Sequence, residues 1–277
     1  MNEEAFAREV EAGERFRFGA NWQRFLTVLD DRRIAEAEKD LKKMMEVDNL
    51  AGKSFLDVGS GSGLSSLAAM RLGASRVHSF DYDPQSAACT AELKRRYFET
   101  STNWTVETGS ALETSYLQSL GQWDIVYSWG VLHHTGDMWT ALENVVPLVA
   151  DRGVLFISIY NDQGRISRQW RWVKRLYISS RVGRRLVAGT IIPYWVISNL
   201  LRDLIKRRNP LNRYKDYIYN RGMSRVHDWH DWLGGYPFEV AKPEQIFDFF
   251  HARGFSLERL LTAGGGLPCN QYVFLRH

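Results

Sequence analysis

The sequence predicts an α/β fold with a doubly wound, mostly parallel sheet of seven strands, leading helices at the N-terminus and a helical insertion after strand five. Three observations support this prediction. Short apolar runs alternate with helix-like stretches between residues 51 and 160. The first run leads into three glycines at every second position. The alternation stops at residue 160 and resumes at about residue 240. We therefore expect N-terminal lid helices over 1–50, a core of 51–160 and 240–277, and a cap with an acceptor-side loop over 161–239.

The leading helices follow from composition. Residues 5–17 mix charged residues with Phe6, Val10 and Phe16, and residues 31–45 are rich in Ala, Glu, Lys, Leu and Met, which favour helices. Residues 18–22 look like a break between them. The acidic, polar start of the chain is unlike a secretory signal, and no apolar run is long enough to predict a membrane span.

The alternating part defines the sheet. Apolar runs predict strands, and the helix-forming stretches between them predict the crossovers of a parallel sheet. The expected strands are 53–58, 76–81, 103–108, 123–128 and 153–159, and the expected helices are 64–72, 86–97, 115–120 and 138–149. A helix starting at Lys242-Pro243 and two last strands, 255–261 and 271–276, complete the sheet.

The glycine-rich stretch, residues 54–63, reads Ser-Phe-Leu-Asp-Val-Gly-Ser-Gly-Ser-Gly. Its glycines allow a sharp turn with a ligand close to the backbone, next to the amides that begin the following helix. The spacing is G-x-G-x-G, and Asp57 lies two residues before the first glycine. A carboxylate at this point suits an ammonium better than a pyrophosphate. The stretch resembles the first motif of class I S-adenosylmethionine-dependent methyltransferases.

The resemblance continues along the predicted sheet edge. Asp81 ends the second strand and is expected to accept both ribose hydroxyls, whereas Asp83, before Pro84, is expected to cap the next helix. Ser110 follows the third strand where the family often has Asp, so its adenine contact should be weaker. The fourth strand leads into Val-Leu-His-His, where His134 matches a recurrent histidine of the family.

The resemblance implies a Rossmann-like fold, S-adenosylmethionine as cofactor and a methyl-transferring enzyme. The plan of the cofactor half is similar to that of the ubiquinone-biosynthesis O-methyltransferases. Leading helices often lie over the cofactor in this family, although Trp22 could equally be an ordinary core residue. The implied cofactor contacts are Asn21, Trp22, Asp57, Gly59, Ser60, Gly61, Gly63, Asp81, Tyr82, Ser110, Ala111, Ser128 and Trp129.

The acceptor side is expected in residues 227–239, which read His-Asp-Trp-His-Asp-Trp-Leu-Gly-Gly-Tyr-Pro-Phe-Glu. His227 or His230 could act as a general base, oriented by Asp228 or Asp231. His134 is another candidate base, and His133 comes next. Two alternatives remain: a hydrogen-bonded loop that anchors the insertion, or a metal site of two His and two Asp. No Cys/His set has zinc spacing, so no metal is expected.

The insertion is basic and aromatic. Residues 161–225 carry sixteen Lys and Arg against three Asp and Glu, a net charge of +13, whereas the rest of the chain carries −9. Residues 186–201 are mostly apolar and lie between two clusters of Arg and Lys. One interpretation is a helical cap that buries the apolar stripe. A compatible second interpretation is peripheral contact of residues 181–208 with a membrane surface.

The composition limits the function classes. The 277 residues are 44% hydrophobic and 25% charged, which is typical of a soluble globular protein, and two cysteines cannot form a disulfide framework. A cytoplasmic location, with membrane association as an addition, is therefore expected. We predict methylation of an O or N atom of a small or lipophilic molecule. The alternatives are a tRNA or rRNA methyltransferase using the basic insertion, disfavoured because no Asn/Asp-Pro-Pro-Tyr motif follows strand four, and a non-catalytic cofactor-binding regulator. The oligomeric state is not predicted.

Overall fold

A mixed sheet of seven strands forms the centre of the computed structural model, which describes residues 3–212, 216–219, 223, 225–264 and 269–277. The strand order is β3-β2-β1-β4-β5-β7-β6. The first five strands are parallel, and β7 runs antiparallel between β5 and β6. The predicted fold class is therefore confirmed. The strands are β1 (Ser54–Val58), β2 (Arg76–Asp81), β3 (Trp104–Thr108), β4 (Trp123–Trp129), β5 (Val149–Tyr160), β6 (Phe255–Leu261) and β7 (Cys269–Arg276).

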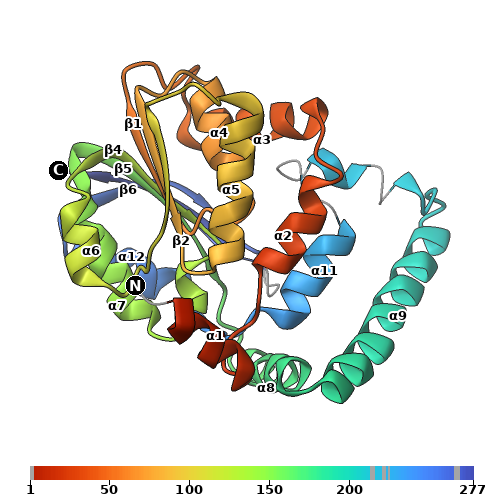
Figure 1. Ribbon diagram of the computed structural model, residues 1–277. Coiled ribbons are helices and arrows are strands. Elements are labelled where there is room, and N and C mark those ends of the chain that lie inside the picture. The colour runs from red at the N-terminus through yellow and green to blue at the C-terminus, as the bar shows by residue number, and fades with distance from the viewer. Residues whose placement is uncertain (1–2, 213–215, 220–222, 224, 265–268) are drawn as a thin grey trace.

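Helices cover both faces of the sheet (Figure 1). Successive strand residues point to opposite faces, so Phe55 packs into one apolar cluster and Leu56 into the other. The helices on the Phe55 side are α3 (Asp31–Met45), α4 (Leu64–Arg71) and α5 (Pro84–Tyr97). Those on the Leu56 side are α6 (Thr114–Ser119), α7 (Met138–Val145) and α12 (Pro243–His251). The order of the strands reverses between β1 and β4, which is where ligands bind in folds of this kind.

One helix boundary differs clearly from the prediction. The helix expected over 138–149 ends at Val145, and a 3-10 turn, η2 (Val146–Leu148), joins it to β5. Pro147 has no N–H to continue the α-helical hydrogen bonds, which explains the early end. Strand β5 starts at Val149 rather than at Gly153, because the first residue pairs with Trp123 of β4.

The remaining helices pack together above the carboxyl ends of the strands. They are α1 (Glu3–Glu11) and α2 (Gly19–Leu26) from the N-terminus, and α8 (Arg165–Ser179), α9 (Arg181–Ile205), η3 (Asp216–Tyr219) and α11 (Arg225–Gly234) from the insertion. Phe16, Tyr177 and Leu233 bury one another in a third apolar cluster. Within the described part of the chain, no helix combines the length and apolar character needed to cross a membrane.

The expectation of a loop at the start of residues 227–239 was wrong, because this segment begins within helix α11. Trp229, Trp232 and Leu233 are spaced three and four residues apart, so they lie on one side of a helix. Trp232 and Leu233 pack in the same cluster as Phe16. Burial of this side stabilises a helix that reaches the first of the two glycines, Gly234.

Candidate active site

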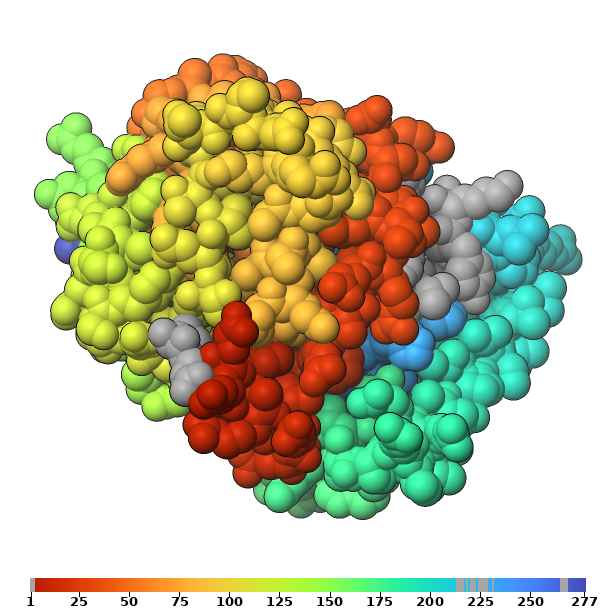
Figure 2. Space-filling view, in the orientation of Figure 1, coloured from red at the N-terminus to blue at the C-terminus, as the bar shows by residue number. Residues whose placement is uncertain are grey.

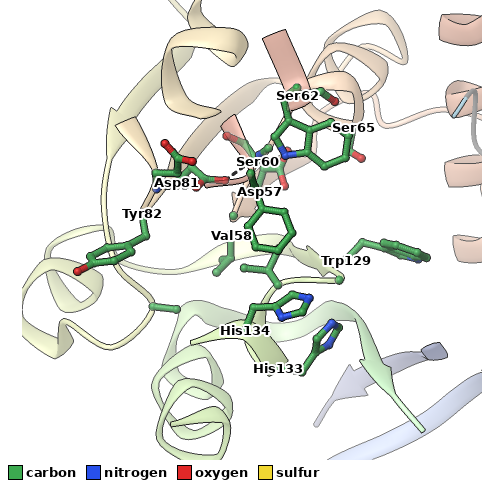
Figure 3. Close-up of a pocket in the computed structure, with 18 of the residues that line it drawn as sticks. Asp57, Val58, Ser60, Ser62, Ser65, Asp81, Tyr82, Trp129, His133 and His134 are labelled. Atoms are coloured by element: carbon green, nitrogen blue, oxygen red, sulfur yellow. Dashed lines mark hydrogen bonds between the residues drawn. The ribbon is translucent and has the colours of Figure 1, made fainter. Parts of the chain in front are cut away.

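A cavity of about 1030 Å³ lies at the switch point of the sheet. Its floor comes from the loops after β1, β2, β3 and β4, and its roof comes from the N-terminal helices and the insertion. Figure 3 shows Asp57 and Asp81 on one side of this cavity and His133 and His134 on the other. The cavity therefore extends from the two acids beside the glycine loop to the two histidines that follow β4.

The glycine loop requires its glycines. Gly59, Gly61 and Gly63 have φ angles of 80°, 55° and 80°, in the left-handed region that side chains disfavour. A Cβ at Gly59 would lie 2.2 Å from Cγ1 of Val131, which follows β4. A Cβ at Gly63 would lie 2.7 Å from the backbone of Thr90 in α5. The loop thus fits between two other elements only without side chains at these positions.

Asp81 holds the loop against the end of β2. Its carboxylate accepts the amide N–H of Gly61 at 2.9 Å and that of Asp83 at 2.8 Å. Burial raises the pKa of Asp81 to about 7. Asp83 has the predicted capping role, because its side chain accepts the N–H of Gln85 at 2.9 Å, and it also accepts the N–H of Gly19 at 2.7 Å. Asp81 thus lines the cavity with a carboxylate that two backbone N–H groups hold in place.

Asp57 ends a buried chain of hydrogen bonds. The indole N–H of Trp104 donates to the hydroxyl of Ser79, Ser79 pairs with Ser66, and Ser66 donates to Asp57. An indole is only a donor, so the chain has one direction, toward the carboxylate. Burial nevertheless raises the pKa of Asp57 to about 7. The glycine-rich motif points to Asp57, whereas no motif in the sequence points to Ser66, Ser79 and Trp104 behind it.

The other predicted cofactor residues divide into two groups. Ser60, Tyr82, Ser110, Ala111 and Trp129 line the cavity. Asn21 and Ser128 do not line it: Asn21 is buried and accepts from Arg24 at 3.3 Å, and Ser128 donates to the carbonyl of Val58 at 2.9 Å. Their positions fit structural roles beside the cavity.

Trp22 and the first helix cover the glycine-loop end. The ring of Trp22 lies over Gly61, close enough that a Cβ there would be 3.1 Å from its Nε1. The hydroxyl of Tyr82 donates to Glu9 of α1 at 3.0 Å, and the guanidinium of Arg15 lies 4.7 Å from the centre of the Tyr82 ring. The sequence predicted a cover from Trp22 but not the contacts from Glu9 and Arg15.

His133 and His134 lie in a 3-10 turn, η1 (Leu132–His134), after β4, and both are buried beside the cavity. Nδ1 of His134 lies 2.6 Å from the carbonyl oxygen of Pro237, so this nitrogen carries the proton and Nε2 is the basic one. Burial lowers the pKa of His134 to about 3 and that of His133 well below its ordinary value. Both rings are therefore neutral at physiological pH.

His133 has an unusual environment. Among the described residues, neither of its ring nitrogens has a hydrogen-bond partner of ordinary geometry. Its ring packs 4.1 Å from that of Tyr160 and 4.4 Å from that of His134. The backbone of Ser158 makes a poorly aligned contact with the ring. Because buried polar atoms are nearly always hydrogen-bonded, an imidazole without a well-formed hydrogen bond beside a cavity is a candidate for contact with a bound molecule.

Of the candidate bases predicted in residues 227–231, only His230 has a described side chain. His227 and Asp228 belong to α11, and their side chains, like that of Asp231, lie outside the described residues. His230 is described: its Nδ1 pairs with the hydroxyl of Tyr177 at 3.1 Å, and burial lowers its pKa. Its side chain is not among those that line the cavity, whereas the neighbouring Trp229 and Trp232 line it.

The part of the cavity under the insertion is largely aromatic. Aromatic side chains from six separate parts of the chain meet there: Phe16, Phe18, Trp129, Tyr160, Trp195, Tyr217, Trp229 and Trp232. The interleaved aromatics of the insertion were the only sequence signal for this wall. Within the described part of the chain, no group of three or more His, Cys, Asp or Glu is arranged to hold a metal ion.

Comparisons with known proteins agree with this geometry. Residues 56–155 match the family described as "Methyltransferase domain". Ribosomal protein L11 methyltransferase of Alteromonas mediterranea is 50% identical over 48 residues, which cover 17% of this chain and 16% of that protein. The protein of the same name from Anoxybacillus flavithermus is 30% identical over 118 residues, covering 34% and 38%. The chain thus spans about a sixth of the first relative and under two fifths of the second.

The solved structures show the same fold over most of the chain. Magnesium protoporphyrin IX methyltransferase from Synechocystis PCC 6803, crystallised with S-adenosylhomocysteine, matches with a TM-score of 0.52 and 14% identity. The match covers 89% of this chain and 84% of that one. At this level of identity the likeness concerns the fold alone.

Proposed function

We propose that this protein, whose residues 56–155 match the methyltransferase domain family, transfers the methyl group of S-adenosylmethionine to an O or N atom of a small, lipophilic molecule. The observation that carries the proposal is the continuity of the cavity. It joins the glycine loop and Asp81 to an aromatic chamber under the insertion. At about 1030 Å³ it is at the upper end of the roughly 300–1,000 Å³ of small-molecule sites, so it has room for two ligands.

The cofactor half of the proposal rests on two acids and the loop between them. Asp81 would accept the ribose hydroxyls while its two backbone contacts hold it in place. Asp57 would attract the ammonium of the methionine portion, supported by the Ser66 hydroxyl. Ser110 and Ala111 would lie beside the adenine, and Trp22 would close the site over Gly61.

The transfer itself is an in-line displacement. A lone pair of the acceptor forms a bond to the methyl carbon while the bond from carbon to sulfur breaks, and S-adenosylhomocysteine leaves. The acceptor proton would go to a ring nitrogen of His133 or to Nε2 of His134, which are neutral and line the cavity. Their lowered pKa values make both rings weak bases, so they suit a proton that methylation of an oxygen has made acidic better than a proton removed beforehand. We propose these two residues ahead of His230, whose side chain does not line the cavity. His227 and Asp228 remain candidates.

The lining of the same cavity supports a separate role for each part of the chain. We propose that 51–160 and 240–277 form the cofactor-binding core, that 1–50 forms a lid and that 161–239 forms a cap on the acceptor. The cap favours an acceptor that can be enclosed. Two cysteines without a disulfide are consistent with a cytoplasmic reaction.

A protein substrate is the second candidate, because the curated relatives are named ribosomal protein L11 methyltransferases. The aligned part of those relatives is short, so it carries little information about the acceptor. The aromatic chamber argues for a molecule smaller than a folded protein. A nucleic-acid substrate has only the basic insertion in its favour.

One experiment separates these candidates. Purified protein is incubated with methyl-labelled S-adenosylmethionine and a cell extract divided into organic-soluble, protein and RNA fractions. We expect label in the organic-soluble fraction, and we expect His133→Ala to reduce it while leaving S-adenosylhomocysteine affinity nearly unchanged in calorimetry. Label confined to the protein or RNA fraction would contradict the small-molecule proposal. Absence of cofactor binding would contradict the enzymatic proposal altogether.

A further inference from the structure

Helix α9 forms the outer edge of the molecule beside α8 and α11 (Figure 1), and it covers one side of the surface in Figure 2. Its inner side is well packed. Val187 is buried, and Trp195 lies 6.3 Å from Trp170 and 5.3 Å from Trp232, measured between ring centres. The outer side has no comparable cover among the described residues.

The outer side of α9 is apolar. Of the eighteen large apolar side chains exposed in the described residues, nine lie on this helix. Their spacing of three and four residues groups most of them on one side. That side, which we call the outer face, carries Val182, Leu186, Ile197, Leu200 and Leu204, with exposed fractions of 66, 59, 56, 41 and 57%. Contiguous apolar surface of this kind marks an interaction site.

Basic residues bracket the outer face. Arg181, Arg184 and Arg185 lie near its N-terminal end, and Arg202 and residues 206–208 lie near its C-terminal end. All of these basic residues are exposed. The single acid between residues 181 and 208 is Asp203, which is buried. Within residues 181–208, the exposed charge is thus entirely positive.

We propose that the outer face of α9 docks on a membrane surface that carries anionic lipid. A helix that combines an apolar face with Arg and Lys at its borders is of the type that lies in the membrane interface, with its apolar side among the acyl chains and its cations near phosphate groups. The charge decides between a bilayer and a second copy of the chain. In a symmetric pair, Arg181–Arg185 or Arg202–Arg208 of one copy would face equally basic segments of the other, with repulsion at both ends.

The same helix borders the cavity. Trp195 and Asn199 line the aromatic chamber from the inner side of α9, opposite the outer face. Docking would therefore hold the chamber one helix away from the bilayer. If the acceptor is lipophilic, as the proposed function states, this position would let it enter from the membrane. The docking itself rests only on the exposed face and its charges.

The test is sedimentation with lipid vesicles, without cofactor or acceptor. We expect binding to vesicles of phosphatidylcholine with about 30% phosphatidylglycerol, weakened by high salt, and little binding to phosphatidylcholine alone. The variant Ile197→Gln/Leu200→Gln/Leu204→Gln should bind roughly tenfold or more weakly. Arg207→Glu/Arg208→Glu should lose binding to the anionic vesicles.

The matched control is Val28→Gln/Leu260→Gln/Leu261→Gln, which removes apolar side chains of similar exposure elsewhere and should bind like the wild type. Equal loss in the control, or no wild-type binding to anionic vesicles, would overturn the proposal. Self-association that the α9 triple variant abolishes, without vesicle binding, would also overturn it and assign the face to a second copy. Calorimetry with S-adenosylhomocysteine verifies that each variant is folded and reports on the proposed function separately.

Discussion

Ser66→Ala tests whether the buried hydrogen-bond chain controls the charge of Asp57. The substitution removes the hydroxyl that donates to the carboxylate and leaves the remaining donors, Ser79 and Trp104, without a connection to it. Asp57 already has a pKa of about 7 because it is buried. Loss of its donor should raise that pKa further, since the hydroxyl favours the ionised form.

The expected size follows from two magnitudes. A hydrogen bond to a charged group contributes about 1.5–3 kcal/mol, and one pKa unit corresponds to about 1.36 kcal/mol, so the pKa should rise by about one to two units. At pH 7.5 the ionised fraction of Asp57 would fall from about three quarters to about a quarter or less. If the ammonium of the ligand requires the carboxylate, affinity at this pH should fall about 3- to 25-fold.

The assay is calorimetric titration with S-adenosylhomocysteine between about pH 6 and pH 9, a range that spans the wild-type pKa of about 7 and its expected rise in the variant. The profile of affinity against pH should move upward in Ser66→Ala and to a smaller extent in Ser79→Ala. Ser86→Ala is the matched control, because Ser86 is buried and its hydroxyl has no partner among the described residues. An unchanged profile in Ser66→Ala would refute the role of the chain.

The same pKa shift predicts a pH dependence of stability. A carboxyl whose pKa is raised on folding binds its proton more tightly in the native state, so its contribution is fully favourable below the ordinary value of 3.8 and is lost as pH rises through about 7. Ser66→Ala should therefore lower the melting temperature more at pH 8 than at pH 5. An equal effect at both values would indicate only lost packing.

Three further outcomes are expected. Asp81→Ala should weaken S-adenosylhomocysteine binding by roughly tenfold or more, because it removes an acceptor that also holds Gly61; unchanged affinity in calorimetry would rule out the ribose contact. Burial lowers the pKa of His133 and His134, so kcat should stay constant as pH falls from 8 to 6. Over the same range the KM for the cofactor should rise, because Asp81 is protonated near pH 7. A kcat that falls between pH 8 and pH 6 would contradict neutral buried histidines. Gly63→Ala should destabilise the protein by about 1–3 kcal/mol in denaturant unfolding, because φ is 80° there; a stability equal to the wild type would contradict that strain.

Much of the core could be predicted because its signals are local. The apolar run of β1 and the glycines after it identify a strand and a turn from neighbouring residues alone. Asp83 before Pro84 predicted a helix cap, and the structure has this cap. The parallel pairing of the first five strands also followed, since helix-forming stretches long enough for crossovers lie between them.

The acceptor side was harder because its signals depend on distant partners. The segment of His230 was expected to form a catalytic loop, yet Trp232 and Leu233 pack under the insertion and favour a helix. Nothing near His134 in sequence indicates that its Nδ1 bonds to Pro237, 103 residues later. The identity of a base depends on such contacts, which residue spacing does not encode.

The sequence by itself determined the methyltransferase fold and the edge of the sheet where a cofactor would bind, because strands, turns and caps depend on neighbouring residues. Only the tertiary structure decided that Trp104, Ser79 and Ser66 converge on Asp57, that both imidazoles after β4 are buried and neutral, and that one side of α9 lines the cavity while the other is exposed. These properties depend on which surfaces meet after folding, and burial then sets the charge of each group.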